Sequence, residues 1–293
     1  MTDVSRVVES GFQFHSRSHS AGVFRKRIPT LVAAILATAV HASPARANDR
    51  HFAFSYESAV LAPGARELEV WNTFRTGRQR YYSQFDHRLE FEVGLVDRLQ
   101  TAFDLNASGV TEQDAFGNRT SSFSYRGISS EWKLKLLDPV ADPIGLALYG
   151  ELELAPDATE GASKIIVDKR IGGALLASNL IAAREWSHAT AETEVETELE
   201  ATLAASYFVA PSLALGVEGR AVGELAHGEL EYATSYAGPV LAYAQETWWA
   251  VIAPMRQLPA LKREDHRSRY ITHGHELWNV RVLFSFHLLA EPP

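Results

Sequence analysis

The stretch YYSQFDHRLEFEV, from Tyr81 to Val93, alternates two kinds of side chain residue by residue. Positions of one parity are mostly aromatic and aliphatic: Tyr81, Ser83, Phe85, His87, Leu89, Phe91 and Val93. Positions of the other parity are polar or charged: Tyr82, Gln84, Asp86, Arg88, Glu90 and Glu92. Because successive side chains of a β-strand point to opposite faces, the stretch predicts a strand with one apolar and one charged face. A membrane barrel turns such an apolar face to lipid and its charged face to a wet lumen.

The same alternation recurs along the chain and predicts about twelve strands. We expect them near residues 64–76, 81–93, 98–106, 128–136, 144–154, 165–186 (two strands joined at Gly172-Gly173), 192–203, 213–220, 235–244, 247–255 and 278–287. Short turns are expected after every second strand, with longer polar loops between the others. This plan favours an all-β fold, a single antiparallel transmembrane β-barrel over residues 64–288 with both ends in the periplasm. The architectural alternative is a soluble periplasmic β-protein.

The N-terminal region has the order of a secretory signal. Basic Arg25-Lys26-Arg27 precedes the apolar run LVAAILATAV at 31–40, and Ala45-Arg46-Ala47 fits a small-x-small cleavage site. The apolar run is about half of the ~20 residues that a spanning helix needs. We therefore expect a signal peptide with a long basic region over 1–47, an N-terminal periplasmic segment over 48–63 and a C-terminal tail over 289–293. The sequence leaves open whether the segment from Asn48 to Gly64 plugs the lumen or hangs in the periplasm.

Charge and cysteine content exclude several functions. Without residues 1–47 the chain holds 22 basic and 34 acidic residues, a net charge of −12, which disfavours nucleic acid as a partner. The chain has no cysteine, so disulfides, thiolate metal sites and lipid attachment through cysteine are excluded. No cofactor is expected.

Aromatic residues cluster near the predicted strand ends, where a membrane barrel carries its interfacial girdles. They are Tyr81, Tyr82, Trp132, Trp186, Tyr207, Trp248, Trp249 and Trp278. Soluble β-proteins also place aromatic residues at strand ends, so this pattern only supports the barrel.

Two motifs carry a family resemblance. The opening, Phe54-Ser55-Tyr56-Glu57, Leu61-Ala62-Pro63-Gly64 and Glu67-Leu68-Glu69-Val70-Trp71, resembles the start of a family of bacterial outer-membrane β-barrels without an assigned function. The segment Gly94-Leu95-Val96-Asp97-Arg98-Leu99 is similar to a periplasmic turn of these proteins and of phenol-degradation-pathway-type transporter barrels. The resemblance implies an outer-membrane location and brings no catalytic residues. The last strand departs from the usual final aromatic residue, because Phe286-His287-Leu288 continues into a tail.

A row of five glutamates is the leading candidate for function. Glu192, Glu194, Glu196, Glu198 and Glu200 share one parity of a predicted strand, so they line one face. In a lumen they would focus a negative potential onto cations, together with Asp86, Arg88, Glu90 and Glu92. The alternative is a structural ladder in which the carboxylates pair with Arg184, Arg220 and neighbouring lysines.

The last long loop carries two weaker candidate sites. His266, His273 and His275 form the best metal-like cluster, because an H-x-H pair on a strand points both rings the same way. Solvated loop histidines are the commoner explanation. Lys262, Arg263, Arg267 and Arg269 are candidate contacts to lipopolysaccharide phosphates.

An enzymatic function is disfavoured. Some twelve-stranded barrels are lipid hydrolases with a serine and histidine on the outer wall, and His87 shares a predicted face with Ser83. Four strand residues span about 13 Å, too far for a nucleophile and its base, although Ser130 has the right parity.

The sequence therefore predicts an outer-membrane β-barrel that is a channel or transporter for small solutes with an acidic lumen. The alternatives are a closed structural or binding barrel that contacts lipopolysaccharide or a partner, and a lipid hydrolase. The expected partners are outer-membrane lipid, lipopolysaccharide, a small solute and the barrel-assembly machinery.

Overall fold

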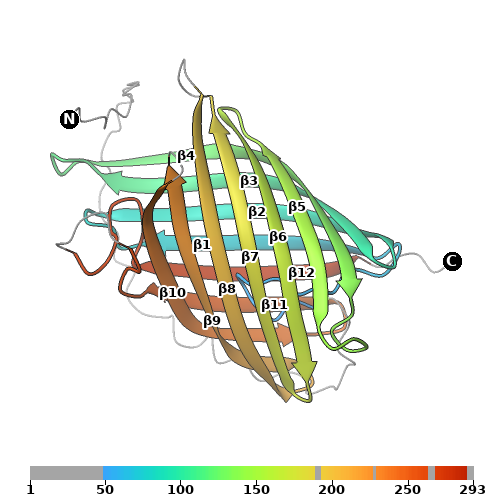
Figure 1. Cartoon of the computed structure of the whole chain (residues 1–293). Helices are drawn as coiled ribbons and strands as arrows, with labels where there is room; N and C mark the ends of the chain where they lie inside the picture. Colours follow the sequence, from blue (N-terminus) through green and yellow to red (C-terminus); the bar gives the residue numbers. More distant parts are fainter. Residues whose placement is uncertain (1–48, 189–192, 227–228, 263–267, 289–293) are drawn as a thin grey trace, which may run out of the picture. The chain divides into compact units, whose positions relative to one another are not determined.

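The computed structural model describes residues 49–188, 193–226, 229–262 and 268–288, which form twelve β-strands closed into one barrel (Figure 1). Each strand is antiparallel to the next, and the barrel closes where β1 pairs with β12 from Arg66↔Leu288 to Thr76↔Trp278. The strands are β1 (Arg66–Thr76), β2 (Tyr82–Val96), β3 (Leu99–Gln113), β4 (Arg119–Leu137), β5 (Gly145–Leu154), β6 (Ala158–Ile171), β7 (Ala174–Ser187), β8 (Glu194–Ala210), β9 (Leu213–Ala226), β10 (Glu229–Ala244), β11 (Trp248–Gln257) and β12 (Trp278–Leu288). Within the described residues no helix is long and apolar enough to cross a membrane.

Burial is inverted relative to a water-soluble sheet. On the outer face, Phe103 is 57% exposed and Leu180 is 61% exposed, whereas Glu69 and Glu90 on the inner face are each 1% exposed. The alternation that the sequence showed in 81–93 therefore extends around the wall, with apolar side chains outward and polar side chains inward. This distribution is that of a transmembrane barrel, because only a nonpolar solvent accepts such an outer surface without a free-energy penalty.

The predicted strand count and antiparallel barrel are confirmed, but the connections differ from the prediction. β3 and β4 run far into the expected loop 107–122, and β6 begins at Ala158, inside the expected loop 156–163. The strict alternation of short and long connections is wrong, since the link 138–144 on one end is longer than the link 227–228 on the other. The outer faces of the β3 and β6 extensions lack large apolar side chains, and a bulge in β4 shifts the parity of Phe123 and Tyr125, so none of these extensions continues the predicted alternation.

The two ends of the barrel remain distinguishable. We call the end with links 97–98, 138–144, 172–173, 211–212 and 245–247 the turn end, and the opposite end, which carries 77–81 and the long link 258–277, the loop end. Two of the aromatic residues expected in girdles face the lumen instead, because their parity is that of the inner face. These are Tyr82, 7% exposed, and Trp249, which is fully buried.

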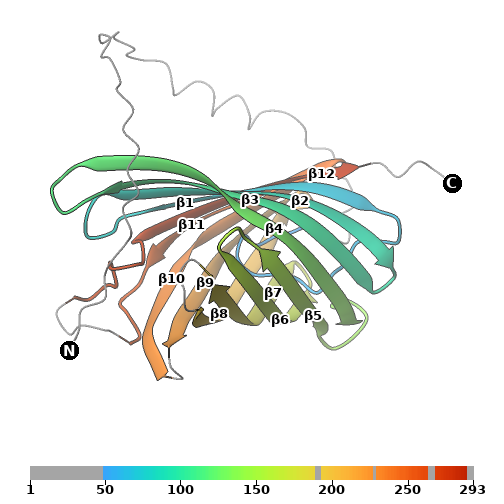
Figure 2. The ribbon, with the colours of Figure 1, turned by 90° about the horizontal axis from the view of Figure 1, so that it is seen from above.

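The predicted signal peptide over 1–47 and the tail over 289–293 lie outside the described residues. The next segment, residues 49–63, is described and has no regular secondary structure. In Figure 2 this blue segment lies between the walls of the barrel. Its contacts form the first part of the candidate site.

Candidate functional site: a plugged lumen and its vestibule

Residues 49–63, here called the plug, are packed inside the barrel, which is one of the two positions that the sequence left open for this segment. Phe52, Ala53 and Ser58 are completely buried, and Phe54 is 3% exposed. Two wall glycines make room for the plug. A Cβ atom at Gly94 would collide with the carbonyl oxygen of Ala62, and one at Gly145 would collide with the Ser58 hydroxyl.

A single wall carboxylate holds the centre of the plug. Glu218 of β9 accepts backbone N–H groups from Ala53 at 3.1 Å, Phe54 at 2.8 Å and Ser55 at 2.5 Å. Glu218 is itself 2% exposed. Three N–H donors around one buried carboxylate compensate its charge without a cation, so Glu218 is the main anchor of the plug.

Two wall amides satisfy further backbone groups of the plug. Asn179 of β7 accepts the N–H of Tyr56 at 2.6 Å and donates to the carbonyl oxygen of the same residue at 3.0 Å. Gln100 of β3 accepts the N–H of Leu61 at 2.9 Å. Since an irregular segment inside a barrel has no ladder of its own, these side chains supply the partners that its backbone needs.

The plug also inserts a cation among wall acids near the turn end. The guanidinium of Arg50 lies over the Tyr56 ring at 4.3 Å and over the Trp71 ring at 4.5 Å. The carboxylates of Glu69, Glu90 and Glu92 stabilise its positive charge. Arg50 thus joins the plug to the β1–β2 wall, opposite the Glu218 anchor.

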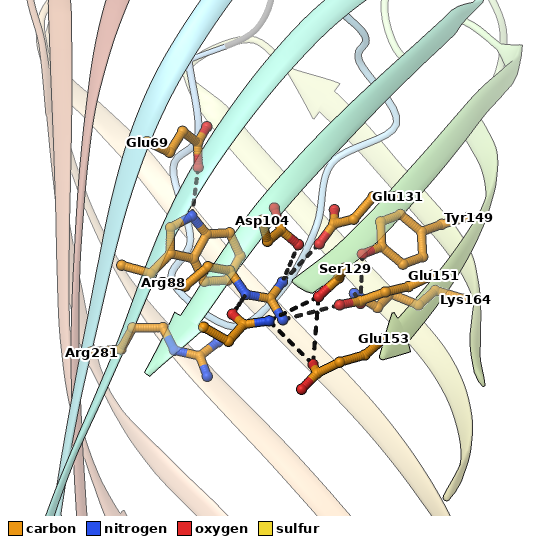
Figure 3. A network of polar contacts seen from close by, with 12 residues as sticks. Glu69, Arg88, Asp104, Ser129, Glu131, Tyr149, Glu151, Glu153, Lys164 and Arg281 are labelled. Atoms are coloured by element: carbon orange, nitrogen blue, oxygen red, sulfur yellow. Dashed lines mark hydrogen bonds and ion pairs between the residues drawn. The ribbon is translucent and has the colours of Figure 1, made fainter. Parts of the chain in front are cut away.

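A second cation, Arg88 of β2, organises the lumen wall beside the plug (Figure 3). Its Nη1 donates to Glu131 at 2.7 Å and lies 3.3 Å from Asp104, while its Nη2 donates to Glu151 at 3.0 Å. Its Nε donates to Asn106 at 3.0 Å. One guanidinium therefore bridges strands β2 to β5 through charge-assisted hydrogen bonds.

Two clusters of three carboxylate side chains are compact enough to suit a cation. They are Glu67, Glu69 and Glu92, and Glu90, Asp104 and Glu131, with ligand atoms within 4.8 Å of one another in each group. Arg50 lies near the first group and Arg88 contacts the second, so a guanidinium already supplies positive charge to each. The structure thus explains both groups without a metal ion.

A polar cavity of about 400 Å³ lies beside the plug, between the plug and the loop end, and we call it the vestibule. Phe54 and Tyr56 of the plug form part of its lining. On the other side of the plug, small spaces of about 20 and 10 Å³ border Glu92 and Lys133. The plug therefore lies between a chamber near the loop end and the turn end of the lumen.

Acidic side chains form a belt across one wall of the lumen, which we call the acidic belt. The strand register places glutamates of β5 to β9 opposite one another in the pairs Glu153↔Glu160, Glu160↔Glu185, Glu185↔Glu196 and Glu198↔Glu224. Sequence reasoning found only its β8 members, because register between strands cannot be read from the parity within one strand. The belt makes this part of the lumen a region of negative potential.

The predicted lumen residues lie where their parity placed them, with differing partners. Asp86 and Arg88 line the vestibule, and Glu90 and Glu92 are buried nearer the plug. Of the glutamate row, Glu194, Glu196 and Glu198 are exposed, Glu200 pairs with Arg220, and Glu192 lies outside the described residues. The predicted ladder is thus present for Glu200, but Arg184 is not part of it, since it lies against Trp186 on the outer face.

The candidate residues of the long loop that the structure describes are not gathered into a site. His273 is exposed and His275 is partly buried, and Gly274 between them has φ of 77°, which breaks the extended geometry that would align the two rings. Lys262 donates to the carbonyl oxygen of Leu230, and Arg269 is exposed. His266, Arg263 and Arg267 lie outside the described residues.

His275 should make the loop sensitive to acid. Burial, with Arg220, Arg78 and Arg75 nearby, lowers the pKa of His275 from 6.5 to about 4, and its ring meets the edge of Tyr232 at 4.7 Å. The neutral ring stabilises the folded loop above pH 6.5, so this contribution, on the order of 2 kcal/mol, is lost as the pH falls from 6.5 towards 4. After correction for the intrinsic slowing of exchange in acid, the hydrogen exchange of residues 268–277 should show an accelerating step over that range. The His275→Gln variant should show no such step, and an identical acceleration in it would contradict the assignment.

The residues of the hydrolase hypothesis are not brought together. On the outer face, His87 contacts Asn72 of β1 at 2.9 Å. Ser130 lies on β4, beyond β3, and accepts a hydrogen bond from Trp132 at 3.2 Å. Asn72 is the polar partner that the sequence reasoning missed.

Comparison with known proteins gives a family and a set of distant structures. The sequence matches the model of a family described as a family of unknown function, DUF6662, over residues 44–171 and 174–286. No curated protein matches it. The NanC porin structure is similar with a TM-score of 0.48 at 10% identity, covering 75% of this chain and all of that chain. The β domain of the Bordetella autotransporter BrkA has a TM-score of 0.47 at 8% identity, covering 77% of this chain and 100% of that chain. The translocator domain of autotransporter NalP from Neisseria meningitidis has a TM-score of 0.47 at 10% identity, covering 78% of this chain and 90% of that chain.

Proposed function

The chain belongs to DUF6662, a family of unknown function, and from the geometry of its lumen we propose that it is an outer-membrane barrel that passes small polar solutes when its plug moves. The outward apolar wall supports a membrane location, and the even number of antiparallel strands supports the outer membrane of a bacterium. In this proposal the turn end faces the periplasm and the loop end faces outward. Similarity to phenol-degradation-pathway-type transporters stays a prediction.

The single observation that carries the proposal is the vestibule. A barrel that served only as a structural element would need no charged chamber of about 400 Å³ in its lumen. The volume lies within the range of small-ligand sites, and its lining offers both hydrogen-bond donors and acceptors. The plug separates this chamber from the turn end, so we assign it the role of the gate.

The test is conductance of the refolded mature protein in planar lipid bilayers. The intact barrel should be mostly closed, and displacing the plug should produce stable open steps. Correct insertion without conductance, even after the plug is removed, would contradict the proposal. That result would favour the alternative of a closed structural or binding barrel, in which exposed basic residues such as Arg269 contact lipopolysaccharide.

The acidic belt should make the open barrel prefer cations. Glu194, Glu196 and Glu198 lie on the part of the belt that is exposed to solvent. Changing all three to glutamine in the plug-free barrel should lower the cation-to-anion permeability ratio, because the negative potential that concentrates cations is reduced. Reversal potentials in asymmetric KCl measure the ratio. Glu246→Gln, an exposed change at the turn end, is the matched control and should leave the ratio unchanged.

A further inference from the structure

The vestibule contains one mainly buried cation that lacks a carboxylate. The guanidinium of Arg281 on β12 donates from Nε to the Thr73 hydroxyl at 2.9 Å and from Nη1 to the carbonyl oxygen of Ala53 at 3.3 Å. Both acceptors are neutral. Among the residues that the structure describes, no carboxylate lies at ion-pair distance from Arg281.

The other cations that are at least partly buried in the vestibule do have acidic partners. Arg75 pairs with Asp86 at 2.9 Å, Arg220 with Glu200, and Lys164 lies 3.8 Å from Glu151. Arg88 has its three carboxylates. Arg281 is therefore distinct, and its guanidinium reaches into the space at the lower left of Figure 3.

The apolar surroundings of Arg281 make its charge unfavourable without a counter-ion. The guanidinium lies 4.1 Å from the centre of the Phe54 ring and 5.4 Å from that of Trp71. These rings are 3% and 6% exposed and keep water from one side of the charge. A buried charge without a counter-ion is unfavourable by several kcal/mol, so the site favours an anionic group. A carboxylate fits best, because it takes two parallel hydrogen bonds from a guanidinium.

The acidic belt favours a cationic group in the same cavity. Glu160 and Glu198 line the vestibule and form no ion pair within the described part of the chain. Each faces another glutamate across the strand register, Glu160 facing Glu153 and Glu185, and Glu198 facing Glu224. Like charges directly opposite repel, so a cationic group placed between them would be stabilising.

We propose that the vestibule binds a small zwitterionic solute, with its carboxylate on Arg281 and its ammonium group on Glu160 and Glu198. This inference rests on the proposed transport function and names its substrate class. The acidic belt attracts the ammonium group first, and Arg281 then receives the carboxylate beside the plug. A ligand bound to Arg281 lies beside the plug, because Arg281 itself contacts Ala53 and Phe54. Its binding is therefore coupled to the plug.

Three compounds with four carbon atoms each distinguish the contribution of the carboxylate to binding from that of the ammonium group. The mature protein, refolded in detergent, is titrated by calorimetry with 4-aminobutyrate, butyrate and butylammonium. The zwitterion should bind about tenfold more tightly than either singly charged compound, since each charge-assisted contact contributes roughly that factor. Equal affinities for the three compounds, or no binding of any of them, would overturn the proposal.

Variants assign each contact. Arg281→Gln should weaken 4-aminobutyrate and butyrate about tenfold and leave butylammonium unchanged. Glu160→Gln combined with Glu198→Gln should weaken 4-aminobutyrate and butylammonium about tenfold and leave butyrate unchanged. Arg126→Gln removes an exposed arginine from the same cavity and is the matched control. Heat-modifiable migration on a detergent gel checks folding, and the wild-type comparison stands alone if a variant does not fold.

The outcome is separable from that of the proposed function. Plug-dependent conductance without discrimination among the three compounds would overturn the substrate class and leave the transport proposal in place. Selective binding by a barrel that never conducts, with or without its plug, would overturn transport instead.

Discussion

Deleting residues 50–60 from the mature protein should change it from a mostly closed barrel to one with long-lived open steps in planar bilayers. The deletion removes Phe52, Phe54 and Tyr56, the plug rings that are buried in the lumen. The barrel itself should survive, because every wall strand pairs with its neighbours through its own backbone and β1 closes on β12 without the plug. Water then replaces the plug around Glu218 and the wall amides.

A point variant tests the same gate without shortening the chain. Glu218→Leu removes the carboxylate that accepts three plug N–H groups at 2.5 to 3.1 Å. Each buried donor left without an acceptor is unfavourable by about 1–3 kcal/mol, so the plug should leave the lumen far more often. We expect frequent open steps of the same amplitude as those of the deletion variant.

Controls decide whether opening comes from the plug. Glu246→Leu makes the same chemical change at an exposed turn-end position and should conduct as the wild type does. Heat-modifiable migration should be retained in all variants. A deletion variant that inserts and stays silent would contradict the assignment of residues 49–63 as the gate.

The fold was largely predictable because a single physical pattern repeats along it. In 81–93 the two faces differ so sharply that parity alone separates Arg88 and Glu90, which face the lumen, from Phe85 and Leu89, which face outward. The same reasoning failed at the ends of β3 and β4. The outer face of β3 beyond Leu105 carries no large apolar side chain, and in β4 a bulge places Phe123 and Tyr125 on the opposite parity from Ile128. It also misplaced Trp249, since the adjacent Trp248 made the pair look like an interfacial girdle.

The candidate site was less predictable because it depends on contacts across the barrel. The sequence showed five glutamates on β8, but the acidic belt runs sideways through β5 to β9 and follows from register. Glu218 and Arg281 had no local signal, because each is one polar residue on an alternating strand. The buried plug was signalled only by its apolar residues Phe52, Phe54 and Leu61, which a segment hanging in solvent would not need.

The second large effect is expected for Arg88, whose removal should destabilise the barrel by about 3–5 kcal/mol. Arg88→Met keeps most of the side-chain volume but leaves Asp104, Glu131 and Glu151 without their shared cation. The side chains of Asp104 and Glu131 are at most 5% exposed, so water can do little to compensate them. The loss should therefore exceed that of an ordinary surface ion pair.

Urea unfolding of the refolded protein in lipid vesicles measures the difference, with Arg75→Met as the matched control. Arg75 also pairs with a carboxylate, Asp86 at 2.9 Å, but the two side chains are 35% and 26% exposed, so its loss should lower stability by about 0–1 kcal/mol. Adding Glu131→Gln and Glu151→Gln to Arg88→Met should restore much of the stability, because neutral amides no longer need the cation. Equal losses for the Arg88 and Arg75 variants would mean that water reaches Arg88 as freely as it reaches Arg75, and the network would then be a solvated cluster rather than the element that joins β2 to β5.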